Sequence, residues 1–288
     1  MEKLFDGDEF CVLSHADLDG VVCVILLMNA FKNQLLDFKV SGYGEGKISA
    51  NLKKLSKKSS KLVISDLSLS DELLDEVDKL FDDVVYLDHH ETTDLSGRDY
   101  KSIINMNASG CLITLALCVE YGFKCSEPLK TMVKYANDYD LWNHKFFNSR
   151  LLNNAYWILG PFEFFDNFIY GIPPNFKKSE LYKKTVNEEK KKKAHFETCD
   201  TYIVDNIRVV VTNDYISDAQ LFYKENNLFI IKDDQGFSLR SEENLAPLYK
   251  LLEEEGIDCG GHKCAGGGTY DGEEEMMKAI EMFVNYLS

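Results

Sequence analysis

The chain of 288 residues has no excess of positive charge. Its 48 acidic side chains outnumber its 32 lysines and arginines, which gives a formal net charge of −16. A protein with this charge repels polyanions, so we expect no binding of long duplex DNA. A short nucleotide remains compatible with this charge if the binding site carries its own cations, and metal ions are a natural source of them.

Long apolar segments are also missing. The longest apolar run, residues 21–28, is far too short to span a bilayer, and the acidic, mixed residues 1–9 do not resemble a secretion signal. The eight cysteines form no scaffold pattern, because four of them lie in apolar segments where a thiol acts as a small hydrophobic group. These four are Cys11, Cys23, Cys111 and Cys118. We therefore expect a reduced, cytoplasmic protein without membrane association.

Strand and helix patterns alternate in the first half of the chain. The composition is 45% hydrophobic, which permits a sizeable core. Short apolar runs predict strands and longer stretches predict helices. The strands are expected at residues 10–14, 38–43, 62–65 and 84–87, and the helices at 20–31, 70–80, 109–121 and 128–137. This alternation predicts an α/β fold with a mostly parallel sheet and helices on both faces.

The second half predicts a separate, smaller α/β domain. After a helical, aromatic-rich stretch at 146–170, Pro173 and Pro174 indicate a break, and a lysine-rich segment follows. We expect a catalytic domain at 1–172, a connecting helix within 173–199 and the smaller domain at 200–288. In that domain, strands are expected at 206–212, 228–232 and 237–240, helices at 246–255 and 273–286, and a glycine-rich loop at 260–268.

Acidic and histidine side chains follow three of the predicted strands. In open parallel sheets, ligands bind just beyond the carboxyl ends of the strands. The three strands would bring one set of side chains to that edge, and so many like charges require cations nearby. The set is His15, Asp17, Asp19, Asp66, Asp88, His89 and His90.

A mixed set of carboxylates and imidazoles suits a pair of divalent ions. Mn²⁺ is the first choice because oxygen ligands dominate, with Mg²⁺ or Co²⁺ as alternatives. Two such ions can clamp the attacking and leaving oxygens of a phosphoryl displacement. An isolated aspartate after a strand, such as Asp66, is usually a turn former or a helix cap. It is the conjunction of the three motifs that indicates function.

These motifs resemble those of the DHH phosphoesterase superfamily. The resemblance lies in His-Ala-Asp-Leu-Asp-Gly at 15–20, Asp66 after a strand, and Asp-His-His at 88–90. Members of this superfamily include RecJ-like exonucleases, nano-RNases, cyclic-dinucleotide phosphodiesterases and family II inorganic pyrophosphatases. The fourth motif of the family is an aspartate after a helix. Residues 136–142 match it, with Asp138 favoured as the ligand and Asp140 as the reserve.

The resemblance implies a role for each motif residue. One metal ion would be held by His15, Asp17 and Asp66. The other would be held by Asp19, Asp66, His89 and Asp138, with Asp66 as the bridge. Asp88 would orient His89 or touch a metal directly, and His90 would face the scissile phosphate. The nucleophile would be a metal-bridging hydroxide.

The second domain resembles the DHH-associated C-terminal domain. Residues 237–241 resemble its Ser-Leu-Arg-Ser strand, and 260–268 resemble its glycine-rich Gly-Gly-His loop. Glycines let backbone N–H groups approach a phosphate, and arginine can grip one in a bidentate fork. The residues expected to bind substrate are Arg240, Ser241, Gly260, Gly261, His262 and Lys263. Cys259 and Lys263 depart from the usual glycine and proline of this loop, and Lys263 would add a phosphate contact.

The leading hypothesis is exonucleolytic hydrolysis of phosphodiester bonds in short oligonucleotides or dinucleotides, in the manner of a nano-RNase. An inorganic pyrophosphatase ranks lower, because the basic Ser-Arg-Lys-Lys element of that branch is missing. The sequence does not distinguish the leading hypothesis from a phosphatase of 3′-phosphoadenosine 5′-phosphate or a cyclic-dinucleotide phosphodiesterase. A non-catalytic nucleotide-binding regulator is disfavoured, because every expected ligand position is filled. The oligomeric state stays open, a homodimer included.

Overall fold

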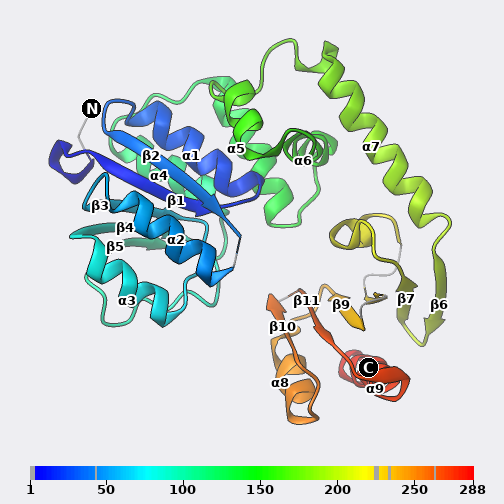
Figure 1. Ribbon diagram of the computed structural model, residues 1–288. Helices are drawn as coiled ribbons and strands as arrows, with labels where there is room; N and C mark the ends of the chain where they lie inside the picture. The colour runs from blue at the N-terminus through cyan, green and yellow to red at the C-terminus, as the bar shows by residue number, and fades with distance from the viewer. Residues whose placement is uncertain (1–3, 43, 224–226, 233–234, 263) are drawn as a thin grey trace. The chain divides into compact units, whose positions relative to one another are not determined.

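A computed structural model describes residues 4–288 except 43, 224–226, 233–234 and 263. The chain forms two compact units, Met1–Glu189 and Lys190–Ser288. The division falls within helix α7 (Glu180–Phe196), which lies in the segment where the sequence predicts a connecting helix (Figure 1). Among the described residues, none of the helices has the length and apolar character that a bilayer crossing needs.

The N-terminal unit is built on a five-stranded sheet in the order β2-β1-β3-β4-β5. Every neighbouring pair in this sheet is parallel, which confirms the predicted sheet type. The strands are β1 (Phe10–His15), β2 (Leu35–Ser41), β3 (Lys61–Ser65), β4 (Asp83–Asp88) and β5 (Lys101–Ile104). Because the strands are parallel, the carboxyl ends of β1, β3 and β4 meet at one edge.

Helices cover both faces of this sheet, as predicted (Figure 1). Alternate residues of β1 point to opposite faces, so Phe10 and Val12 pack in one core and Cys11 and Leu13 in the other. The first core contains α1 (Leu18–Ala30), α4 (Gly110–Glu120), α5 (Glu127–Asp140) and α6 (Phe147–Phe168). The second contains α2 (Glu45–Leu55) and α3 (Asp71–Leu80). The 3₁₀ segments of this unit are η1 (Leu4–Gly7) and η2 (Phe176–Lys178).

The C-terminal unit is a second α/β body with a mixed sheet in the order β10-β11-β9-β8-β7-β6. Only β7 and β8 pair in parallel within it. The strands are β6 (Asp200–Val204), β7 (Ile207–Val211), β8 (Leu228–Ile231), β9 (Gly236–Arg240), β10 (Cys259–His262) and β11 (Ala265–Thr269). The helices are η3 (Ile216–Leu221), α8 (Ala246–Glu254) and α9 (Gly272–Leu287). The α8 and α9 helices supply apolar side chains to the larger core of this unit.

Most of the glycine-rich segment lies in two strands and not in the expected loop, with residues 260–262 in β10 and 265–268 in β11. Strands β10 and β11 pair antiparallel, and β11 pairs in turn with β9. A side chain at Gly266 would lie 2.3 Å from the hydroxyl of Tyr249, and one at Gly268 would lie 2.2 Å from the carbonyl oxygen of Asp258. The glycines therefore permit close packing of the strands, a use that glycine has less often than turn formation.

Candidate active site

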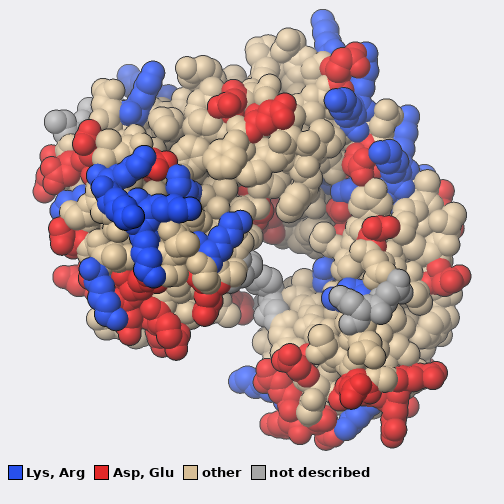
Figure 2. Space-filling view, viewed as in Figure 1, with Lys and Arg blue, Asp and Glu red and all other residues tan. Residues whose placement is uncertain are grey.

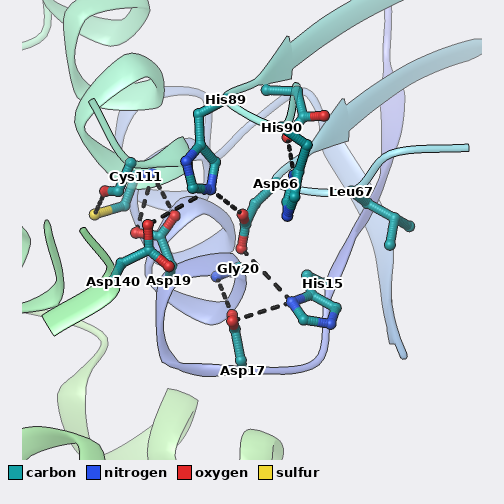
Figure 3. A network of polar contacts seen from close by, with 12 residues as sticks. His15, Asp17, Asp19, Gly20, Asp66, Leu67, His89, His90, Cys111 and Asp140 are labelled. Atoms are coloured by element: carbon teal, nitrogen blue, oxygen red, sulfur yellow. Dashed lines mark hydrogen bonds and ion pairs between the residues drawn. The ribbon is translucent and has the colours of Figure 1, made fainter. Parts of the chain in front are cut away.

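The motif residues of the N-terminal unit meet at the carboxyl edge of its parallel sheet (Figure 3). His15 ends β1, Asp88 ends β4, and Asp66 directly follows β3. Asp17 and Asp19 lie at the start of α1, and Asp140 is the last residue of α5. Parallel pairing of β1, β3 and β4 thus brings segments distant in the chain to one place.

The turn between β1 and α1 sets the direction of its two aspartates. Asp17 is the N-cap of α1 and accepts a hydrogen bond of 2.9 Å from the N–H of Gly20. A side chain at Gly20 would lie 2.3 Å from the carbonyl oxygen of His15, so only glycine fits this approach. Asp19 is buried in the first turn of the helix, where the helix dipole favours a negative charge.

Asp66 and Asp19 are held in place by the start of α4. Asp66 has a positive φ of 54°, a left-handed conformation that aspartate tolerates better than most residues. A side chain at Gly110 would lie 2.6 Å from the Cβ atom of Asp66 and 3.0 Å from Oδ2 of Asp19. The N–H of Cys111 lies 3.2 Å from both carboxylate oxygens of Asp19. The sequence reasoning did not identify Gly110 or Cys111.

Asp66 lies between two groups of potential ligands. On one side, Nδ1 of His15 lies 3.0 Å from Oδ2 of Asp17 and 4.0 Å from Oδ2 of Asp66. On the other side, Nε2 of His89 lies 3.1 Å from Oδ1 of Asp66 and 3.5 Å from Oδ2 of Asp140. Three overlapping groups of residues have potential metal-ligand atoms that lie within 4.8 Å of one another. The groups are His15, Asp17 and Asp66; Asp19, His89 and Asp140; and Asp66, Asp88, His89 and His90.

Of the two aspartates proposed for the fourth motif, the reserve residue Asp140 lies among the candidate ligands and Asp138 does not. Both oxygens of the Asp138 carboxylate are engaged within the loop after α5. Oδ1 accepts from the N–H of Lys145 at 3.0 Å, and Oδ2 accepts from the N–H of Phe146 at 3.1 Å and the hydroxyl of Ser149 at 2.7 Å. Asp138 thus shapes the loop, while Asp140 reaches His89. The preference for Asp138 as a ligand is corrected accordingly.

The Asp88 carboxylate binds the ring of His90, while its expected role in orienting His89 or touching a metal stays a prediction. Its Oδ1 accepts a hydrogen bond of 2.7 Å from Nδ1 of His90, and its Oδ2 accepts one from the hydroxyl of Thr93. Burial alone would raise the pKa of Asp88, but the hydrogen bond and charge of His90 lower it. Asp88 is therefore a fully buried carboxylate that fixes the His90 ring. Thr93 completes this arrangement and was not identified from the sequence.

The carboxylates at the centre of the site repel one another. Burial, and then the charges of Asp17 and Asp19, raise the pKa of Asp66 well above its ordinary value. Burial, and then the charge of Asp17, raise the pKa of Asp19 to about 6. The pKa of Asp140 is raised by burial and then by Asp19. Burial would also raise the pKa of Asp17, but its hydrogen bond to His15 lowers it. Carboxylates crowded together in this way favour a cation bound among them.

The donor set fits divalent cations. Oδ2 of Asp66 and Oδ2 of Asp140 are buried and accept no hydrogen bond from the described residues. Buried carboxylate oxygens are normally satisfied, so these two atoms are suited to ligate a metal ion. Carboxylate oxygens with imidazole nitrogens are ligands that Mn²⁺ and related divalent ions accept. The residues that would hold such ions are His15, Asp17, Asp19, Asp66, His89 and Asp140.

The expected substrate residues of the C-terminal unit have differing environments. The guanidinium of Arg240 donates to the carbonyl oxygens of Leu239 at 2.7 Å and Gly266 at 3.4 Å, and it forms no ion pair with a carboxylate of the described residues. Ser241 is only 1% exposed, and its hydroxyl donates to Asn227 and accepts from the N–H of Glu243. This engagement does not support the expected substrate contact of Ser241.

Three of the remaining expected substrate residues, Gly260, Gly261 and His262, lie on β10. The backbones of Gly260, Gly261 and His262 pair with β11. For Gly261 and His262 the structure describes the backbone alone, and Lys263 lies outside the described residues. Their roles in substrate binding stay predictions.

Comparison with known proteins identifies the N-terminal part of the chain. Residues 9–138 match the model of the DHH family, N-terminal domain. No curated protein matches the chain.

Solved structures of low sequence identity share the fold over nearly the whole chain. A DHH domain described as a member of the s1p family of ribosomal proteins is 14% identical, with a TM-score of 0.69 over 98% of this chain and 87% of that one. An exopolyphosphatase-related protein from Bacteroides fragilis is 18% identical, with a TM-score of 0.61 over 97% and 92%. Exonuclease RecJ bound to manganese is 14% identical, with a TM-score of 0.60 over 98% and 91%.

The family match covers β1, β3, β4, α1 and α4, and it ends at Asp138 within α5, two residues before Asp140. It therefore rests on the same segments that carry the sequence motifs, and it confirms the resemblance at the level of the superfamily. The N-terminal unit therefore carries a DHH family N-terminal domain at residues 9–138.

Proposed function

We propose that this protein hydrolyses phosphodiester bonds in short oligonucleotides or dinucleotides, exonucleolytically and with two divalent cations. The observation that carries this proposal is the position of Asp66 between two ligand groups, with Oδ1 toward His89 and Oδ2 toward His15. A pair of cations at such a site clamps the oxygens of a phosphoryl group and stabilises the charge that develops on them. Mn²⁺ is the first choice, and RecJ is a protein of this fold with bound manganese.

His90 is the side chain that would act on the phosphate. Because the buried Asp88 accepts from Nδ1, the ring is held in one orientation, and Nε2 is the nitrogen that would donate to a phosphate oxygen. The hydroxyl of Thr93 donates to the other oxygen of the Asp88 carboxylate and so helps to hold it. Asp19 and Asp140 would anchor the cations from the side of the helices α1 and α5.

Surface charge favours a short substrate. Figure 2 shows lysine and arginine side chains gathered in the region of α2 and along α7, and many acidic side chains elsewhere in this view. Two lysines in the region of α2 are neutralised by carboxylates, Lys53 by Glu76 and Lys58 by Asp37, each at 3.0 Å. A short ligand needs less positive surface than a long strand.

Arg240 is the feature that favours a phosphorylated end. Its guanidinium is half-buried and lies against carbonyl oxygens, and burial lowers its pKa. A cation in this state binds an anion readily, and a guanidinium fits a phosphate in a bidentate fork. We infer that Arg240 holds a terminal phosphate of the substrate.

A substrate panel tests this proposal. The protein is incubated with Mn²⁺ and with 5′-phosphorylated di- and pentanucleotides, long single strands, a cyclic dinucleotide, 3′-phosphoadenosine 5′-phosphate, pyrophosphate and polyphosphate. We expect the fastest turnover, with release of mononucleotides, on the shortest linear strands. Asp66→Asn should abolish it, and the exposed Asp82→Asn should not. Hydrolysis of pyrophosphate or polyphosphate alone would refute the oligonucleotide assignment.

A further inference from the structure

A separate cavity lies between α5, α6 and the segment 172–177 of the N-terminal unit. Its volume is about 310 Å³, and none of the candidate metal ligands lines it. This volume is at the lower end of the range for small-molecule sites, and it suits one or two fused rings better than a larger ligand. The wall of the cavity includes Pro128, Thr131, Tyr135, Asn148, Ile172 and Lys177.

The wall of this cavity is fixed before any ligand binds. Gly171 has a φ of +90°, and a side chain there would lie 2.3 Å from the carbonyl carbon of Pro128. The N–H of Ile172 donates to the carbonyl oxygen of Pro128 at 3.3 Å. Pro173 and Pro174 follow and restrict the backbone further. A ligand would therefore not have to order this segment, which removes one of the main costs of binding.

The chemistry of the wall points to a planar ring. Pro128, Ile172 and Pro173 give apolar surface. Tyr135 and Asn148 add a polar edge, because the Asn148 amide donates to the Tyr135 hydroxyl at 3.2 Å, and the two groups retain a hydroxyl donor and a carbonyl acceptor. An apolar slot with a few polar groups on one side is typical of sites for aromatic heterocycles.

The rim of the cavity favours a negative charge on the ligand. Two charged residues of opposite sign line it, Glu127 and Lys177. Glu127 is paired with Lys130 at 2.7 Å, so its charge is compensated. Lys177 is exposed and forms no ion pair with the described residues. The rim therefore presents a net positive charge to a ligand.

We propose that this cavity binds a planar aromatic molecule with one anionic group, the ring lying against Pro128, Ile172 and Tyr135 and the anion near Lys177. This site is separate from the metal centre and does not depend on catalysis. The same chemistry occurs in aromatic carboxylates and in mononucleotides.

Titration of the full-length protein with indole-3-acetate in the presence of EDTA tests this proposal. Two-dimensional NMR or calorimetry should give saturable binding with a dissociation constant on the order of 1 mM, from the usual binding strength per ligand atom. Lys177→Glu should weaken binding by about threefold or more, as expected for an exposed charge contact. Lys178→Glu is the matched control, because this neighbour is exposed but does not line the cavity, and it should bind as the wild type does.

Two further variants complete the test. Thr131→Phe should fill the cavity and remove saturable binding, with the circular dichroism spectrum reporting whether the variant folds. Arg240→Ala should bind the probe as the wild type does, because the expected phosphate contact of the C-terminal unit is not involved. Equal affinities for Lys177→Glu and Lys178→Glu, or loss of binding in Arg240→Ala, would overturn the proposal.

Discussion

Substitution of Asp19 by asparagine should stabilise the metal-free protein at neutral pH. Burial and the charge of Asp17 raise the folded-state pKa of Asp19 to about 6. An aspartate in an unfolded chain has a pKa of about 3.9, and a difference of about two units corresponds to roughly 3 kcal/mol. Because the folded pKa is the higher one, the stability linked to Asp19 is present below pH 3.9 and is lost as the pH rises through 6. Asparagine keeps an oxygen for the Cys111 N–H but does not ionise.

Urea unfolding in EDTA measures this effect. Both tryptophans, Trp142 and Trp157, lie in the N-terminal unit, so their fluorescence reports on the unit that holds Asp19. Asp19→Asn should exceed the wild type in unfolding free energy by about 3 kcal/mol at pH 7.5, and by only about 0.5 kcal/mol at pH 4.0. The exposed Asp82→Asn is the control and should show no such pH-dependent gain.

Addition of Mn²⁺ should make the wild type more stable than Asp19→Asn. The wild type should gain stability on binding the ion, since a ligand of the folded state stabilises by mass action. Asp19→Asn should gain less stability, because it lacks one ligand of the group formed by Asp19, His89 and Asp140. If Asp19→Asn and the wild type have the same stability in EDTA at both pH values, the charge repulsion inferred for the site is refuted.

Substitutions at four more positions test individual contacts. Thr93→Val should lower turnover about tenfold by removing a hydrogen bond to a buried carboxylate, and Thr93→Ser should restore it; equal rates would exclude a positioning role. Gly110→Ala should cost about 1–3 kcal/mol in urea unfolding and weaken Mn²⁺ binding measured by calorimetry, while Gly46→Ala, with open space around it, should do neither. Asp138→Asn should mainly lower the stability, and Asp140→Asn mainly the Mn²⁺ affinity; the opposite pattern would restore Asp138 as the ligand.

The buried parts of the fold were predictable because their residues are apolar without interruption. Strands β1, β3 and β4 are such runs, and their ends gave the positions of most site residues. Helix α2 was not predicted, because its polar sequence buries few apolar side chains, mainly Ile48, Leu52 and Leu55. Strand β5 was missed as well, since it is a short and mostly exposed edge strand that pairs with β4 alone. Edge strands carry little hydrophobic signal.

The details of the site depended on facts that a sequence does not contain. Asp138 and Asp140 both satisfy the pattern of an aspartate at the end of a helix. Residues two positions apart on a helix are rotated by about 200° about its axis, so the two side chains face opposite sides. The choice between them required the positions of His89 and of the loop after α5. Thr93 gave no signal of its own, because a threonine in a polar loop is common.

The candidate ligands come from distant parts of the chain, so the site can form only after these parts have folded together. His15, Asp66 and His89 come together only after β1, β3 and β4 have paired, and Asp140 arrives only when the last turn of α5 has docked. A nascent chain that stops short of this turn has no complete second ligand group. A cation bound by Asp19, His89 and Asp140 would therefore require the docked end of α5, and mass action would then stabilise this folded state.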